Sequence, residues 1–481
     1  MRRREFLKTA AIGAAAAAFP AVLHSATSRR GQPNVLFISV DDMNTDGTLW
    51  GGTGPQTPYL GRLAQRGVRF SRNYCQYPLC NPSRSSLMTG FRPERTQVFG
   101  NGRHFRASLP DVVTLPQLFK NHGYFSARVG KIYHYDNPGG IGTNGLDDAP
   151  SWNEVLNPIG CDRTQLMEHA INYTPTHPLG FSISLYADPT GRDEDYTDGM
   201  VASNAIRLLE QHRGEPFFLG VGFFKPHCPH IVPQKYFDLY PENSIDVPEM
   251  PPNYRDTVPS GALGSTIPWP NFGVTREQAR AVKRAYYAAT SFVDAQIGRV
   301  LAALDRLELR ENTIVVFWSD HGFHVGDHGL WHKESCFEQS ARVPLIVAAP
   351  GVAAAAQPCP RIVEHVNIFP TVAELAGLEL PAKLDGVSLR PLLDNPLAPW
   401  DRPAFTQRDK NAKNGIPIGH SVRTERWRYT QWDEGRKGEE LYDHESDPGE
   451  MRNLATDPGH APVVAELTRL IRQNWPGRSQ G

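Results

Sequence analysis

The stretch N-V-L-F-I-S-V at residues 34–40, followed directly by two aspartates, decides the fold. It is a short, nearly continuous apolar run with β-branched residues, which is typical of a strand buried on both faces of a parallel sheet. The stretch T-I-V-V-F-W-S at residues 313–319 has the same character and is followed by D-H-G. The sequence therefore contains two buried strands that both end in acidic residues.

Further segments extend this pattern. Residues 217–224 and 345–349 are also strand candidates, and apolar residues recur with a 3.6-residue period between residues 286 and 304. Strands that alternate with helices predict an α/β sandwich with a mixed, mainly parallel central sheet flanked by helices. Residues 137–187 and 241–273 are irregular and rich in Gly and Pro, so we expect long surface excursions that shape a substrate pocket.

The chain changes character after residue 393. Residues 421–432 alternate like an antiparallel strand, residues 440–443 form another short one, and residues 463–475 have the pattern of an amphipathic helix. We therefore expect a catalytic domain over residues 27–393 and a small C-terminal α+β subdomain with an antiparallel sheet over residues 394–481.

The N-terminus has the features of an export signal. M-R-R-R-E-F-L-K is followed by an Ala-rich apolar run over residues 9–23, and R-R-E-F-L-K resembles the bacterial twin-arginine pattern. We expect cleavage after Ala26, which makes residues 1–26 the signal peptide. The alternative is a membrane anchor, but the run is shorter than the roughly 20 residues of a spanning helix. We predict an exported protein, periplasmic or extracellular, with no stable membrane anchor.

Composition excludes some partners. The chain has 481 residues, with 50 Lys and Arg against 51 Asp and Glu, so no basic excess is present to bind a phosphate backbone. We therefore expect no nucleic-acid partner. Six cysteines in a chain of this length do not make a disulfide framework, and we predict no particular bridge.

The most specific motif is L-C-N-P-S-R-S-S-L-M-T-G at residues 79–90. Pro82 suits the first turn of a helix, so Cys80 is expected near a helix N-terminus, where free N–H groups and the helix dipole favour an anionic group. Arg84, one turn later, can direct a cationic donor to the same place. The alternative is a buried cysteine before a short helix.

The acidic residues after the two buried strands are candidate metal ligands: Asp41, Asp42, Asp320 and His321. Ligands of open α/β sheets bind beyond the carboxyl ends of the strands, and acidic oxygens favour a hard cation. An isolated Asp-Asp pair would more simply be a solvated turn or a helix cap. A zinc site is a weaker alternative, because its candidate ligands match no closed tetrahedral spacing: His227, Cys228, His230, His324, His328 and His332.

Three further segments carry cationic or proton-transfer groups. These are G-K-I-Y-H at residues 130–134, K-P-H-C-P-H at residues 225–230 and G-D-H-G-L-W-H-K at residues 326–333. Their candidate catalytic residues are Lys131, His134, His227 and Lys333. Taken singly, each of these residues could be structural. Together with the Cys80 motif they indicate one site.

These motifs, in this order, resemble the type I, formylglycine-dependent sulfatase family. The resemblance includes C-x-P-S-R with its T-G ending, and L-Y-D-x-x-x-D-P at residues 441–448 followed by Asn453 and Leu454. Within the family, the G-K-x-x-H and K-P-H segments look most like the iduronate-2-sulfatase branch. The resemblance implies an alkaline-phosphatase-like fold and covers nearly the whole mature chain.

The resemblance also implies the cofactors. A separate formylglycine-generating enzyme would oxidise Cys80 to formylglycine, and one Ca²⁺ would be held by the four strand-end residues together with the modified Cys80. The expected substrate is a sulfated carbohydrate. The hydrated aldehyde would attack the sulfate sulfur, because an unmodified Cys or a Ser has no internal route for releasing sulfate afterwards.

The same resemblance implies roles for the remaining residues. Lys131, Lys333 and Arg84 would hold the nucleophile, the sulfate and its growing charge. His227 would protonate the departing oxygen, and His134 would help to deprotonate the second hydroxyl.

Two other functions remain open at this point. One is a phosphohydrolase or phosphonate monoester hydrolase of a related fold, although a two-metal phosphatase would need more acidic and His ligands than the sequence offers. The other is a sulfated-glycan binding protein that has lost catalysis. An unmodified Cys80 would favour that function.

Overall fold

The computed structural model describes residues 32–408 and 417–475. The predicted signal peptide lies outside these residues. None of the helices that the structure describes is long and apolar enough to cross a membrane.

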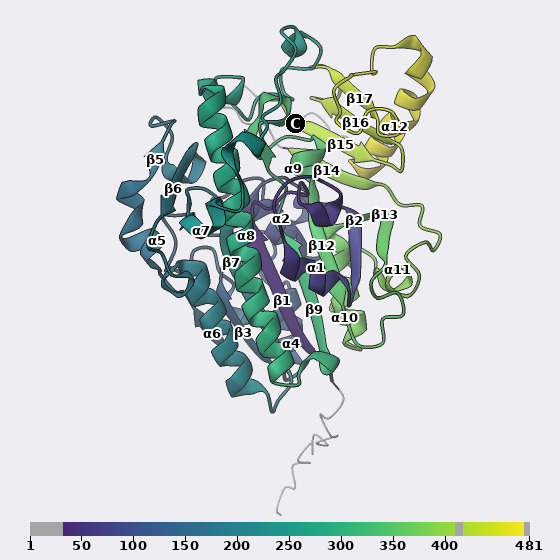
Figure 1. Ribbon diagram of the computed structural model, residues 1–481. Coiled ribbons are helices and arrows are strands. Elements are labelled where there is room, and N and C mark those ends of the chain that lie inside the picture. The colour runs from purple at the N-terminus through teal and green to yellow at the C-terminus, as the bar shows by residue number, and fades with distance from the viewer. Residues whose placement is uncertain (1–31, 409–416, 476–481) are drawn as a thin grey trace, which may run out of the picture. The chain divides into compact units, whose positions relative to one another are not determined.

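An eight-stranded sheet forms the centre of the fold (Figure 1). Only one of its strands, β12, runs antiparallel to its neighbours, and every other pair is parallel. The structure thus confirms a mixed, mainly parallel sheet. In spatial order the strands are β13 (Pro358–Glu364), β2 (Val68–Tyr74), β12 (Arg342–Ala348), β9 (Thr313–Ser319), β1 (Asn34–Asp41), β7 (Phe217–Pro226), β3 (Phe125–Gly130) and β4 (Glu154–Leu156).

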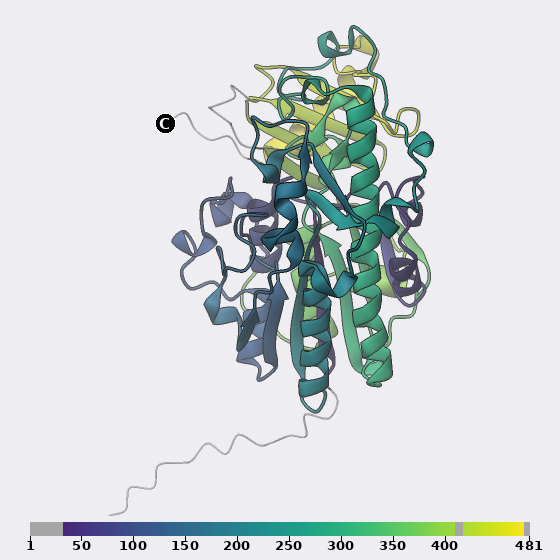
Figure 2. The ribbon, with the colours of Figure 1, turned by 60° about the vertical axis from the view of Figure 1, so that its left-hand side comes forward.

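Helices cover both faces of this sheet. Along β1, Val35 and Phe37 pack into one apolar cluster, while Leu36 and Ile38 pack into another on the opposite face, as the alternation of strand side chains requires. Figures 1 and 2 show α6 and α8 side by side across one face. That face also carries α1, and the other carries α2, α4 and α10: α1 (Pro58–Ala64), α2 (Cys80–Thr89), α4 (Leu115–Asn121), α6 (Thr197–His212), α8 (Arg276–Arg306) and α10 (Ile368–Leu375).

The central predictions correspond to observed elements. The four strand candidates are β1, β7, β9 and β12, and the periodic helix is α8. This helix starts ten residues before the predicted stripe, where Thr275 and Gln278 form a capping box. The shorter elements are α3 (Pro93–Thr96), α5 (Cys161–Thr164), α7 (Gln234–Phe237), α9 (Glu338–Ala341), α11 (Arg390–Asp394), β10 (His324–Val325) and β11 (Trp331–His332).

The first predicted excursion, residues 137–187, is more ordered than its sequence suggests. It contributes β4 to the edge of the central sheet. Its other two strands form a small sheet in which β6 (Ser184–Asp188) lies between β5 (Ile171–Asn172) and β8 (His230–Pro233). Strands of two to five residues are too short to show a period in the sequence.

A separate antiparallel sheet lies toward the C-terminus, beyond the carboxyl end of β1 (Figure 1). Its strands follow chain order: β14 (Ala404–Arg408), β15 (Gly419–Arg423), β16 (Trp427–Trp432) and β17 (Glu439–Asp443). Helix α12 (Ala461–Asn474) packs Leu467 and Ile471 against one face of it. The prediction of one strand over residues 421–432 was wrong. A turn at Thr424 divides it into a hairpin, with the Thr424 N–H donating to the Trp427 carbonyl at 2.8 Å.

Candidate active site

The carboxyl ends of β1 and β9 bring the predicted acidic residues together. The two strands are adjacent and parallel, with Val40 level with Ser319. The Asp42 N–H donates to Asp320 Oδ1 at 3.1 Å, across 278 residues of sequence. Asp41, Asp42, Asp320 and His321 are all completely buried. The solvated turn that an isolated Asp-Asp pair would suggest is therefore excluded.

Asp42 has an unusual backbone. Its φ of 70° lies in the left-handed region, which non-glycine residues rarely occupy. The Tyr286 hydroxyl, from α8, donates to the Asp42 carbonyl at 2.9 Å and accepts from the Asn44 N–H at 2.8 Å. Tyr286 therefore supports the turn that directs Asp42 into the site. Sequence reasoning missed this role, because Tyr286 belongs to the apolar stripe of its helix.

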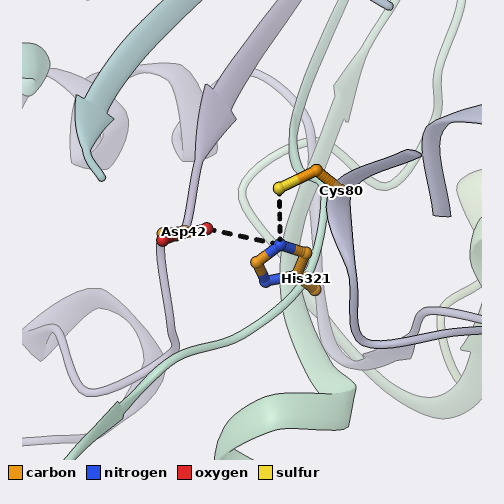
Figure 3. Close-up of side chains that lie close together, drawn as sticks. All are labelled: Asp42, Cys80 and His321. Atoms are coloured by element: carbon orange, nitrogen blue, oxygen red, sulfur yellow. Dashed lines mark hydrogen bonds and ion pairs between the residues drawn. The ribbon is translucent and has the colours of Figure 1, made fainter. Parts of the chain in front are cut away.

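Cys80 is the first residue of α2 and lies at the centre of the site (Figure 3). Its Sγ is 3.3 Å from His321 Nε2 and 3.5 Å from Lys333 Nζ, and the residue is 2% exposed. His321 Nδ1 lies 2.8 Å from the Gly322 carbonyl, which can only accept a hydrogen bond. The ring therefore carries its proton on Nδ1 and directs Nε2 toward Cys80 and toward Asp42 Oδ1 at 3.3 Å.

Arg84 is buried beneath the acidic residues. Its Nε donates to Asp320 Oδ2 at 3.0 Å, and its Nη1 donates to the Lys131 and Ile132 carbonyls, both at 2.9 Å. Nη2 lies 3.4 Å from Asp41 Oδ1. Because every nitrogen of the guanidinium contacts the protein, Arg84 holds the acidic residues in place.

Two lysines neutralise the aspartates. Lys131 Nζ lies 2.7 Å from Asp41 Oδ2, and Lys333 Nζ lies 2.6 Å from Asp42 Oδ1. Burial opposes ionisation of Asp41, but Lys131, His227 and Arg84 outweigh it and hold the pKa of this carboxyl well below its usual range. Burial raises the pKa of Asp42 to about 7, although Lys333 opposes the shift. The two neighbouring carboxylates are thus unequally compensated.

Both predicted histidines have free ring nitrogens. His227 Nδ1 lies 2.6 Å from the Cys228 carbonyl, while Nε2 lies 3.6 Å from Asp42 Oδ2. His134 is 4% exposed, and neither of its ring nitrogens has a hydrogen-bond partner. Burial and then Lys131 lower the pKa of His134 to about 3, so this imidazole is neutral at pH 7. Buried polar atoms without partners are rare in folded proteins and indicate contact with a ligand.

The donor set fits a hard divalent cation. Ligand atoms of Asp42, Cys80 and His321 lie within 4.8 Å of one another, as do those of Asp41, Cys80 and Asp320. Asp42 Oδ2 is buried without a hydrogen-bond partner, which leaves it available to a metal. Carboxylate oxygens dominate, as Ca²⁺ and Mg²⁺ prefer. Among the described residues, no such cluster includes the six His and Cys side chains considered for zinc.

Family comparison agrees with this geometry. Residues 33–378 match the sulfatase family model, and residues 326–475 match the model for the C-terminal part of N-sulphoglucosamine sulphohydrolase. A sulfatase of Formosa agariphila is 32% identical over 92% of this chain and 86% of its own. Mouse iduronate 2-sulfatase is 31% identical over 90% of this chain and 93% of its own.

Solved structures share the fold over most of the chain. A "2-O GAG sulfatase" is 25% identical, covers 92% of both chains and has a TM-score of 0.70. A phosphonate monoester hydrolase of Agrobacterium radiobacter is 26% identical, covers 92% of this chain and 96% of its own, and has a TM-score of 0.75. These similarities agree with the expected alkaline-phosphatase-like architecture.

The chain therefore belongs to the sulfatase family, the class that the buried acidic site and the Cys80 motif define. Its similarity to iduronate 2-sulfatases agrees with the branch that the motifs indicated. It is a hydrolase of sulfate esters.

Proposed function

We propose that this sulfatase removes an O-sulfate from a sugar or uronic acid of a sulfated polysaccharide. In this proposal Cys80 becomes formylglycine, and one Ca²⁺ is held by Asp41, Asp42, Asp320 and His321 together with the modified Cys80. Residues 27–393 would form the catalytic domain and residues 394–481 the C-terminal subdomain.

One observation carries the proposal. Cys80 Sγ, at the N-terminus of α2, lies within 3.5 Å of both a buried imidazole and a buried ammonium group, beside three buried carboxylates. This Sγ marks the place that the oxygen atoms of a formylglycine would occupy. The N-terminus of α2 and the Lys333 ammonium favour negative charge at this point, as sulfate binding requires.

Both absent groups supply chemistry that this chain lacks. A hydrated formylglycine supplies two hydroxyls on one carbon, one to attack sulfur and one to allow the later release of sulfate. A bound Ca²⁺ supplies positive charge that polarises the sulfate and favours ionised oxygens. Asp42 Oδ2, which has no hydrogen-bond partner, and His321 Nε2, which faces Cys80 and Asp42, are the ligand atoms that would bind it.

The side chains of this protein would hold the nucleophile and the sulfate and would transfer the protons. Lys333 lies between Asp42 and Cys80, so it can hold both the nucleophile and a sulfate oxygen. His227 Nδ1 donates to the Cys228 carbonyl, so the ring passes a proton to the departing oxygen only after Nε2, which lies 3.6 Å from Asp42 Oδ2, has itself gained one. Burial and then Lys333 hold the pKa of His227 well below its usual range, so this extra proton is readily released. His134 can accept the proton of the second hydroxyl, because both of its ring nitrogens are free.

The remaining residues of the site act through position. Lys131 keeps Asp41 ionised beside the nucleophile, as its 2.7 Å contact shows. Arg84 is a positioning residue, because its hydrogen bonds hold Asp320 and the backbone that carries Lys131.

The sugar substrate, the export route and the maturation partner are also proposals. Similarity to mouse iduronate 2-sulfatase, over most of both chains, supports a 2-O-sulfated uronate as the first substrate to try. The twin-arginine pattern at residues 3–8 supports export to the periplasm or beyond. The C-x-P-S-R motif supports recognition by a formylglycine-generating enzyme.

Fragmentation mass spectrometry of the tryptic peptide of residues 73–84 tests the nucleophile. The protein should come from a host that matures sulfatases, and fragmentation is needed because Cys75 lies in the same peptide. We expect an aldehyde or its hydrate at position 80. An unmodified Cys80 in such protein would contradict the proposed mechanism and favour a glycan-binding role.

Turnover of matched esters tests the reaction. We expect sulfate esters of sugars to react faster than the corresponding phosphate and phosphonate esters, and Cys80→Ala to lose at least about 10⁴-fold in kcat/KM. Cys359→Ala is the matched control, because Cys359 is also buried but packs near Pro396 and outside the site. Faster turnover of phosphonate esters would assign the site to the phosphonate hydrolases instead.

A further inference from the structure

Phe181 differs from every other large aromatic residue of the fold. Among residues 32–408 and 417–475 it is the only Phe, Tyr or Trp with an exposed side chain, at 41%. Its ring centroid is only 5.9 Å from Lys333 Nζ, although Lys333 itself is 3% exposed. Phe181 therefore lies where the buried catalytic centre meets solvent.

The segment that carries Phe181 is held firmly in place. A Cβ atom at Gly180 would lie 2.1 Å from the Asn137 carbonyl, so only glycine allows this approach to the segment after His134. The Ser182 hydroxyl donates to the Leu179 carbonyl at 2.9 Å. The ring is thus presented by a rigid turn.

The chain after Phe181 also ties this turn to the other two catalytic segments. β6 pairs with β8, with Leu185 opposite His230, three residues after His227. The ring of His332, which precedes Lys333, lies beside the Phe181 ring. Phe181 therefore lies where the segments of His134, His227 and Lys333 converge.

The two predicted excursions meet at the same place. The His332 ring centroid lies 6.3 Å from that of Phe181 and 5.3 Å from that of Phe272. Phe181 belongs to the first excursion, residues 137–187, and Phe272 to the second, residues 241–273. An aromatic wall beside Lys333 is thus built from both excursions.

We propose that Phe181 forms the apolar wall of the substrate entrance and packs against the carbon-bound hydrogens of the sugar that carries the sulfate. This inference rests on the proposed function, since it names the contact that selects the leaving group. The sulfate must lie among Cys80, Lys333 and His227, which are at most 4% exposed. The sugar must then extend toward solvent, past the one exposed ring that lies next to Lys333.

An aromatic wall suits a sugar for physical reasons. The faces of a pyranose ring carry C–H groups, and packing them on a flat ring buries apolar area without leaving polar atoms unpaired. The ring also contributes little to a bare sulfate ion, which is held by cationic groups. Phe181 should therefore affect the affinity for the sugar and leave the affinity for sulfate unchanged.

Binding to the unmatured protein tests this inference without requiring turnover. Protein with an unmodified Cys80 would be titrated by calorimetry with inorganic sulfate, a 2-O-sulfated uronate disaccharide and glucosamine 6-sulfate. We expect Phe181→Ala to raise the Kd of the tighter-binding sugar about tenfold, while the Kd of sulfate stays within about twofold of its wild-type value. Phe181→Trp should keep the wild-type preference. Leu397→Ala, at a 65% exposed apolar residue, is the matched control.

The outcomes separate this inference from the proposed function. An equal loss of affinity for sulfate and for the sugar would mean that Phe181 only shields Lys333. An unchanged affinity for the sugar would mean that the sugar lies elsewhere. Either result overturns the inference, as does a wild-type protein that binds neither sugar. A matured wild-type enzyme without turnover would instead overturn the proposed function, and the binding comparison would still decide the role of Phe181.

Discussion

Two clusters of buried charge differ in how completely their atoms are paired. The site cluster consists of Asp41, Asp42, Asp320, Arg84, Lys131 and Lys333. The α9 cluster consists of Glu338, Glu450, Arg423, Arg428 and His444, and it joins α9 to the inner face of the C-terminal sheet. Both clusters lie at the end of the central sheet where β1 terminates.

In the α9 cluster every carboxylate oxygen has a partner. Glu338 accepts from the Tyr74 hydroxyl at 2.9 Å and from Arg428. Glu450 accepts from Arg428 at 2.5 Å, from the Glu338 N–H at 2.7 Å and pairs with His444 at 2.9 Å. Burial opposes ionisation, but Arg428 and His444 outweigh it and lower the pKa of Glu450 to about 2.

In the site cluster the pairing is incomplete. Asp42 Oδ2 and both nitrogens of the adjoining His134 are buried without partners. A fully paired network stabilises the fold, whereas free polar atoms in a buried site are retained for a ligand. Burial and charge alone therefore do not distinguish the two clusters, whereas the pairing of their carboxylate oxygens does, since Asp42 Oδ2 alone among them has no partner.

Removing a carboxylate from the site cluster should have the largest effect on activity. We expect Asp42→Asn to lower kcat/KM at least about 10³-fold, because a metal ligand beside the nucleophile is lost. Added Ca²⁺ should raise the Tm of the wild-type protein but not of Asp42→Asn, which gives a readout independent of turnover. The exposed Asp195→Asn is the control. Full activity of Asp42→Asn would contradict the proposed role of Asp42 as a metal ligand.

Breaking the α9 cluster should instead lower the stability of the fold. Arg428→Met leaves two buried glutamates without their shared cation, so we expect a loss of about 3–5 kcal/mol in the free energy of unfolding by urea titration. The KM of the folded fraction should stay near the wild-type value. Arg436→Met removes an exposed ion pair and should change stability by less than about 1 kcal/mol. A stable Arg428→Met would contradict a structural role for this cluster.

Acid should weaken the α9 cluster first. The folded pKa of Glu450 is about 2, below its value of 4.5 in an unfolded chain. Its stabilisation is therefore complete above pH 4.5 and is lost as the pH falls from there toward 2. The midpoint of urea unfolding should fall between pH 6 and pH 3. The free energy of unfolding of Glu450→Gln should fall by up to about 1.4 kcal/mol less per pH unit than that of the wild-type protein. Parallel curves for the two proteins would refute this assignment.

A single hydroxyl should have the smallest effect. Tyr286→Phe removes the hydrogen bond to the Asp42 carbonyl and leaves the Asn44 N–H unpaired. We expect kcat to fall about tenfold and stability to fall by about 1 kcal/mol, with KM nearly constant. Tyr287→Phe is the matched control, because its hydroxyl makes no hydrogen bond among the described residues. An equal effect of both substitutions would deny Tyr286 a positioning role.

Much of the site could be predicted from short stretches of sequence. The C-x-P-S-R motif placed Cys80 near a helix N-terminus, and two apolar runs placed Asp41 and Asp320 at the carboxyl ends of buried strands. These predictions need only the local chain, since a strand, its end and a helix start depend on residues close in sequence. The antiparallel hairpin at Thr424 was missed because its turn is polar and only a few residues long.

The sequence by itself determined the class of fold and the kinds of side chain at the site. Tertiary structure alone decided that Arg84 donates to Asp320, that Tyr286 holds Asp42, and that Phe181 lies beside Lys333. The physical reason is the range of the interactions. Periodicity and caps depend on neighbours along the chain, whereas these contacts join residues more than 100 positions apart, and only the packing of helices and strands brings them together.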